Sequence, residues 1–183
     1  MHSGSLRPAI LPAIALALLF SIGAKSVRAE DAPADPAKGP AIVSFKSLLA
    51  LLPAAPEGWT AEKPEGNTVR MGAVEMTVVT AKYAKGESTA SIEIIDYAWQ
   101  RDTMKGLTMG WQFSNESTDG YQKGFSVGGS PGYETFIEAD KAGNVFLIAG
   151  DRFFVHIEVQ GEKAGTARDW LQRIDLKTLA ATK

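Results

Sequence analysis

The stretch from Tyr133 to Gln160 most limits what this chain can fold into, because it predicts three strands in a tight antiparallel meander. Within it, two strongly apolar runs, 145–149 and 152–159, are separated only by Gly150-Asp151. Glycine and aspartate both tolerate the positive φ angles of a two-residue hairpin turn. We therefore expect this turn to fix the register in which the two runs pair.

That register would place Ala149 opposite Arg152, and directly opposed residues share one face of a sheet. The expected core face is wholly apolar and consists of Phe146, Ile148, Phe153, Val155, Ile157 and Val159. The expected second face mixes apolar and charged groups, namely Val145, Leu147, Arg152, Phe154, His156 and Glu158. We expect this second face to be only partly covered.

The first 29 residues have the features of a secretory signal peptide. They contain no acidic residue, carry Arg7 near the start, and continue through a short apolar core to Val27-Arg28-Ala29, a small-x-Ala cleavage sequence. The alternative is an uncleaved membrane anchor, although Pro8 and Pro12 shorten the apolar core that would have to span the bilayer. The pattern favours cleavage after Ala29 and a periplasmic or secreted protein with no stable membrane span.

The composition of the chain excludes some partners and supports one folded domain. The net charge of the 183-residue chain is −2. The charged residues of the leader are all basic, so its removal makes the remainder more acidic and a poor nucleic-acid binder. Residues 30–40 contain three prolines and no large apolar side chain, which predicts a flexible linker. Residues 41–183 contain no cysteine and are long enough to form one domain with a real core.

The remaining patterns predict helices that flank a central sheet. Apolar residues recur at helical spacing after Ser44, between residues 101 and 113, and after Thr166, a predicted N-cap. Further strands are expected within 67–85, 88–97 and 121–127. The predicted fold class is therefore α+β, a single domain with a central antiparallel sheet flanked by helices as an α/β/α sandwich.

No motif in the sequence identifies a catalytic, cofactor or metal site. The segment Gly128–Gly132 matches the G-x-S-x-G pattern of serine hydrolases, but Pro131 lacks the N–H that the residue after the nucleophile must donate, so we interpret it as a turn. His156 is the one histidine after the leader, too few for a zinc site. Phosphate-binding and dinucleotide-binding motifs are absent. Paired-carboxylate glycosidase chemistry stays open, because such pairs meet only in space.

The segment 101–113 is predicted to be a helix that contains the pattern Gly106-x-x-x-Gly110. One interpretation is that these glycines let the helix pack closely on the sheet. The other is a mobile lid, because glycine loosens the backbone and methionine and tryptophan are adaptable apolar groups. The predicted ligand or partner surface combines this segment with the second sheet face: Val145, Leu147, Phe154, His156, Met104 and Trp111.

Several short segments together resemble a group of small exported bacterial proteins of unknown function. The segments are Pro56-Glu-Gly-Trp59, Gly120-Tyr121-Gln-Lys-Gly124, Pro131-Gly132-Tyr133-Glu134, Asp151-Arg152-Phe153 and Ile174-Asp-Leu-Lys-Thr-Leu-Ala180. The order of elements is also similar to the extrinsic subunits of the oxygen-evolving photosystem, an antiparallel sheet between helices. This resemblance implies a fold, and it brings no catalytic residues to this chain.

By elimination of site chemistry, we expect a non-enzymatic exported protein that binds or stabilises an envelope partner. The alternative is a carrier of a small apolar ligand on the second sheet face, beneath the lid-like helix. An enzyme whose site is assembled in space is the third interpretation. A deep pocket would favour the carrier, a flat apolar patch the partner-binding protein, and clustered buried carboxylates the enzyme.

Overall fold

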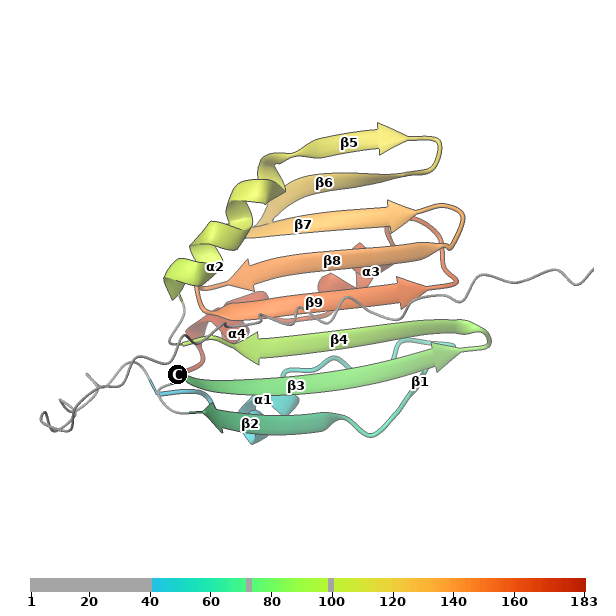
Figure 1. Ribbon diagram of the computed structural model, residues 1–183. Helices are drawn as coiled ribbons and strands as arrows, with labels where there is room; N and C mark the ends of the chain where they lie inside the picture. The colour runs from blue at the N-terminus through green and yellow to red at the C-terminus, as the bar shows by residue number, and fades with distance from the viewer. Residues whose placement is uncertain (1–40, 72–73, 99–100) are drawn as a thin grey trace, which may run out of the picture. The chain divides into compact units, whose positions relative to one another are not determined.

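A nine-stranded antiparallel sheet dominates the computed structural model, which describes residues 41–183 except 72–73 and 99–100 (Figure 1). The strand order is β1-β3-β4-β9-β8-β7-β6-β5, and β2 also pairs with β3. The strands are β1 (Thr60–Ala61), β2 (Glu65–Met71), β3 (Val74–Lys85), β4 (Ser88–Asp96), β5 (Ser114–Ser117), β6 (Gly120–Val127), β7 (Ser130–Ile137), β8 (Ala142–Ala149) and β9 (Phe153–Gln160). The predicted antiparallel sheet and its β7-β8-β9 meander are confirmed.

The helices are short and do not form complete layers beside the sheet. They are α1 (Phe45–Leu49), α2 (Arg101–Thr108), the 3-10 helix η1 (Met109–Gln112), α3 (Thr166–Leu171) and α4 (Leu176–Ala181). Ser44 caps α1 as predicted, because its hydroxyl accepts from the backbone N–H of Lys46. The N-cap of α3 is Gly165 and not the predicted Thr166, because Gly165 has a left-handed backbone conformation with a φ of +85° and the helix begins after it.

The main core lies between one face of the sheet and the helices α1, α3 and α4, which are behind the sheet in Figure 1. Alternate residues of β3, β4, β9 and β8 point into it and are almost completely buried. On α3, Trp170 packs on Tyr83 and Trp59 with ring centroids 4.4 and 5.2 Å apart, and the Tyr83 hydroxyl donates to the carbonyl of Pro53. These three helices cover one face of the sheet only, and the opposite face is here called the outer face.

The predicted register of the β8–β9 hairpin is wrong by one residue. Ala149 pairs with Phe153, not with Arg152, so Val145 and Leu147 lie on the core face and Phe146 and Ile148 on the outer face. Gly150 and Asp151 do take positive φ angles of 59° and 53°, and the N–H of Arg152 donates to the carbonyl of Ala149. Arg152 is an extra residue between the turn and β9, as in a bulge.

The side chain of Arg152 explains why it leaves the ladder. Its Nε and Nη2 atoms each donate to a carboxylate oxygen of Asp96 at 2.7 Å, and both residues are buried. Asp96 also accepts from the backbone N–H groups of Val43 and Ala98, and the carbonyl of Arg152 accepts from the N–H of Tyr97. A buried charge needs such partners, so satisfying this pair decides the register of the hairpin.

The predicted signal peptide, residues 1–29, and the predicted linker, residues 30–40, lie outside the described residues. Within the part of the chain that the structure describes, none of the helices has the length and apolar character needed to cross a membrane.

Candidate functional site: the outer face of the sheet

The segment α2–η1 connects β4 to β5 and lies on the outer face. In Figure 1 it crosses the ends of the strands from the β4 side to the β5 side. The rings of Trp111 and Tyr133 stack, with centroids 6.4 Å apart and an interplanar angle of 14°. A Cβ atom at Gly124 would lie 1.8 Å from the carbonyl oxygen of Trp111, whereas Cβ atoms at Gly106 and Gly110 would meet nothing. The glycine that permits close packing is therefore in the sheet, not in the predicted helix pattern.

An aromatic row follows Trp111 across the outer face, perpendicular to the strands: Trp111, Tyr133, Phe146 and His156. Tyr133, Phe146 and His156 occupy opposed positions on β7, β8 and β9, so they stand side by side. The rings of Phe146 and His156 are nearly parallel, with centroids 4.6 Å apart. All members of the row are half-buried.

Toward α2, the outer face carries a small second core that is separate from the main one. Ile95, Ile148 and Met104 are buried but do not belong to the main core cluster. Phe154 is half-buried at this end, with its ring centroid 6.5 Å from that of Tyr97. One end of the outer face is therefore covered and apolar.

The structure brings together only some of the residues predicted from sequence. Phe154, His156 and Trp111 are half-buried on the outer face, and Met104 is buried. Two further members of the predicted surface, Val145 and Leu147, are completely buried in the main core because of the register shift. They cannot contact a ligand on the outer face.

Sequence reasoning missed a polar row on the outer face, beside the aromatic row and farther from α2. Its members occupy consecutive opposed positions on β5, β6, β7, β8, β9 and β4: Asn115, Gln122, Thr135, Asn144, Glu158 and Ser91. Each strand contributes one residue to the row, and the sequence contains no signal that aligns these six among the other polar residues of their strands. Only the register of the whole sheet places them in one line.

The aromatic row orients the amide groups of the polar row. The Tyr133 hydroxyl donates to Oε1 of Gln122 at 3.0 Å, and Nε2 of His156 lies 3.1 Å from Oδ1 of Asn144. Both amide oxygens are thus engaged, while the amide nitrogens of Gln122 and Asn144 donate to no other described residue. Each –NH2 group offers two donors, so the face presents fixed donors to whatever lies over it.

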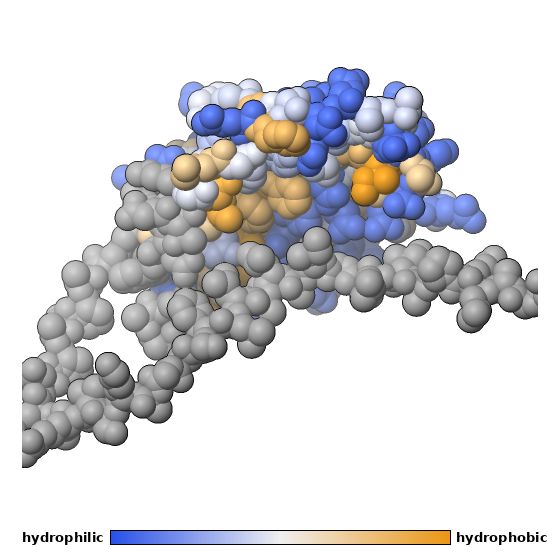
Figure 2. All heavy atoms as spheres, turned by 45° about the horizontal axis from the view of Figure 1, so that its top comes forward, coloured by the Kyte–Doolittle hydropathy of each residue, from blue (hydrophilic) through white to orange (hydrophobic). Residues whose placement is uncertain are grey.

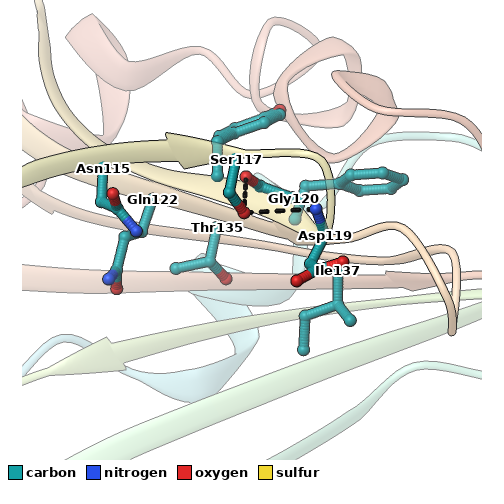
Figure 3. Close-up of a pocket in the computed structure, with 9 residues that line it drawn as sticks. Asn115, Ser117, Asp119, Gly120, Gln122, Thr135 and Ile137 are labelled. Carbon is teal, nitrogen blue, oxygen red and sulfur yellow. Dashed lines mark hydrogen bonds between the residues drawn. The ribbon is translucent and has the colours of Figure 1, made fainter.

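Shallow hollows are present at both ends of the polar row. The first, about 350 Å³, is lined by Asn115, Gln122 and Thr135, whose side chains project to the same side of their strands (Figure 3). A hydrogen bond from the Asp119 N–H to the Ser117 hydroxyl shapes its rim. The second, about 190 Å³, is lined by Glu158 and Ser91, by the charged residues Glu62 and Lys82, and by further residues of β3, β4 and β9.

Two titratable groups in the middle of the outer face have shifted pKa values. Burial lowers the pKa of His156, which the Glu158 carboxylate partly opposes. Burial raises the pKa of Glu93, which is directly opposite His156 on β4. Each shift favours the uncharged form of its group, because burial penalises a charge.

The two buried carboxylates of the described residues are Asp96 and Glu134. Each is held by its own partners, and the two do not form a catalytic pair. Asp96 is saturated by Arg152 and two backbone donors. Glu134, on the core side of β7, accepts from the Tyr121 hydroxyl at 2.5 Å, and burial followed by this hydrogen bond raises the pKa of Tyr121. Within the described residues there is no group of three or more His, Asp or Glu that could hold a metal.

The G-x-S-x-G match is a hairpin turn, as predicted. Gly128 and Gly129 have positive φ angles of 56° and 82°, and Ser130 begins β7 opposite Val127. A strand and not a helix follows the serine, so the arrangement differs from a hydrolase elbow.

The surface of α2–η1 exposes large apolar side chains. Met109 is 78% and Phe113 57% exposed, and Leu107 is also exposed. Figure 2 shows the molecule with the top of Figure 1 brought forward, and apolar residues form separate groups among hydrophilic ones. On the face that Figure 2 shows, these apolar groups do not merge into one continuous patch.

Comparison with known proteins gives no relative from which a function could be transferred: no family model, no curated protein and no solved structure matches the chain.

Proposed function

We propose that this is an exported, non-enzymatic binding protein, and that the outer face of its sheet contacts an envelope partner. The observation that carries the proposal is the polar row: aligned hydrogen-bonding side chains with oriented, unused donors, on the face that α1, α3 and α4 leave open. Covering these donors removes them from water, which costs free energy unless the partner supplies hydrogen-bond acceptors for them. In this proposal α2–η1 is the partial second cover, which gives the three-layer order that the resemblance implies.

Export is tested by the intact mass of the chain recovered from its own cells. The acid-free apolar leader predicts a mature protein that begins at Glu30. Recovery of the full-length chain from membranes would instead support the anchor alternative.

The binding surface is tested by cysteine protection, since the sequence has no cysteine of its own. Thr135→Cys places a thiol in the polar row, and Gln172→Cys, an exposed residue after α3, is the matched control. In intact cells we expect Thr135→Cys to react with a small maleimide about tenfold more slowly than in the purified protein, as for a site about nine-tenths occupied. The control should react equally in both settings. Equal rates at Thr135→Cys would show that the outer face is free and would refute the proposal.

A carrier of a small apolar ligand is the second candidate, and the small core beneath α2 favours it. Ile148 is buried opposite half-buried Phe154, and Met104 of α2 is also buried, so a modest outward movement of α2 would open an apolar space. Native mass spectrometry of protein purified from its own envelope would detect a retained ligand as an added mass. A ligand-free mass would leave the surface-binding proposal as the better one.

A further inference from the structure

We propose that the outer face binds an extended, uncharged polysaccharide chain, which lies along the polar row across the strands. This inference rests on the proposed function, because it names the chemical class of the partner for the same surface. It is carried by four features of the row: its chemistry, its spacing, its position on the face of the sheet, and the hollows at both ends.

The chemistry of the row is that of a surface for hydroxyl groups. It carries three side-chain amides, two hydroxyls and one carboxylate, and each can donate to or accept from a sugar hydroxyl. Glu158 is the one acidic member, and its Oε1 already accepts from Nε2 of Gln160 at 2.7 Å. No member of the row is basic, so the row is poorly suited to a polyanion.

The spacing of the row suits a repeating polymer. Neighbouring strands lie about 4.8 Å apart, so the row presents one polar side chain about every 4.8 Å over roughly 24 Å from β5 to β4. A sugar unit in an extended polysaccharide has a similar length, so successive units would meet successive strands. A single small ligand would use only one or two of these positions.

The position of the row distinguishes a polysaccharide from a peptide. An extended peptide usually binds a sheet by pairing with the backbone of an edge strand. The polar row lies on the face of the sheet, where Gln122, Thr135 and Asn144 are in strands whose backbones already pair on both sides. Only side chains are available there, and a chain rich in hydroxyl groups can satisfy them.

The hollows indicate where the ends of the polymer would rest. One of about 350 Å³ lies at Asn115, Gln122 and Thr135, and one of about 190 Å³ lies at Glu158 and Ser91. Between them the aromatic row lies along one side of the polar row and holds the amides of Gln122 and Asn144 in place. A recess at either end of one row favours a long ligand over a short one.

The inference is tested by calorimetric titration of the purified full chain, as its host produces it, with β-1,4-linked oligomers of N-acetylglucosamine and of glucose. We expect saturable binding of at least one hexamer and about tenfold weaker binding of the corresponding dimer, because a dimer reaches only part of the row. An α-1,4-linked glucose hexamer, which curls, should bind more weakly than an extended hexamer. The two β-linked series identify whether acetamido groups or hydroxyl groups are preferred, and binding of either supports the proposal.

Substitutions locate the binding on the polar row. Asn144→Ala and Gln122→Ala should each weaken hexamer binding about three- to tenfold, the effect of losing one hydrogen bond. Asn115→Ala, at an exposed position that cannot endanger folding, should weaken it by a similar or smaller factor. Gln172→Ala removes an amide elsewhere and should change nothing.

Lack of saturable binding by both β-linked hexamers would overturn the inference, as would hexamer binding that all three row variants leave unchanged. Cysteine protection at Thr135 in cells without oligosaccharide binding would leave the proposed function standing and refute only the polysaccharide, in favour of a protein partner. Unprotected Thr135 would refute the proposed function itself.

Discussion

The two faces of the sheet are made from alternate residues of the same strands, yet they differ in almost every physical property. On β9, Phe153 is completely buried beneath the helices, whereas its neighbour Phe154 is half-buried on the outer face. The core face is apolar and continuous over four strands. The outer face is divided into a covered apolar end, an aromatic row and a polar row.

Under the proposed function, this difference separates stability and recognition onto opposite faces of one sheet. A buried apolar face contributes most to the free energy of folding, and it leaves little freedom to change its residues. A half-open face contributes less, so its residues can be chosen to meet a partner.

The largest effect is expected from Phe153→Ala on the core face. Removing a completely buried phenylalanine should reduce the free energy of unfolding by about 3 to 5 kcal/mol, because a cavity remains in the core. Urea denaturation measures it. The matched control is Phe113→Ala, at a position 57% exposed, which should change the stability by less than about 0.5 kcal/mol. Similar losses of stability for the two variants would mean that Phe113, the residue directly after η1, packs in a real core.

A somewhat smaller loss, about 3 kcal/mol, is expected for Arg152→Ala, because it leaves the Asp96 carboxylate buried without its charged partner. Arg70→Ala is the matched control, since Arg70 and Glu75 also form an ion pair at 2.7 Å, but at the surface. Its loss should be at most about 1 kcal/mol. If the two ion pairs proved equal in denaturation experiments, the role of Arg152 in fixing the hairpin would have to be abandoned.

An intermediate loss, about 2 kcal/mol, is expected for Phe154→Ala, because this side chain is only partly covered. Amide hydrogen exchange should also be faster in residues 104–112 than in 145–159, since α2–η1 lies over the sheet as a thin cover. A loss as large as that of Phe153→Ala, with strong protection of α2–η1, would make the outer end ordinary core. It would also remove the ligand-carrier alternative.

The smallest effect concerns pH. Burial lowers the pKa of His156 in the fold, so the folded state favours the neutral ring and loses stability as the pH falls below about 6.5, the ordinary histidine value. His156→Gln should abolish this loss, which we expect to be under about 1 kcal/mol for a half-buried ring. Thermal unfolding of both proteins from pH 7.5 to 5 measures it.

Glu93 provides the opposite control on the same surface. Burial raises its pKa, so the folded state favours the protonated acid and gains stability as the pH falls toward 4.5, the ordinary value. Glu93→Gln should therefore make the loss of stability on acidification steeper. If neither substitution changed the pH dependence of stability, the centre of the outer face would have to be well hydrated.

Much of the fold was predictable because its signals are local. Alternation in β4 and β9, the glycine turns at 128–129 and 150, and the Ser44 cap each act within a few residues. The core face of β9 was therefore predicted correctly. The candidate site was predictable only in part: Phe154, His156 and Trp111 do lie on the outer face. The positions of Val145 and Leu147 depended on the register of β8 against β9, which was predicted wrongly.

The sequence by itself determined the antiparallel meander, the helix positions and the lack of a recognisable catalytic motif. Tertiary structure alone decided the register of β8 against β9, since Arg152 leaves the ladder to reach Asp96, a residue 56 positions away in the chain. It also decided that six scattered polar residues form one row. The physical reason is the same in both cases. Strand pairing and the need of a buried charge for a partner bring together residues that are distant in sequence, and no local sequence pattern shows which residues will meet.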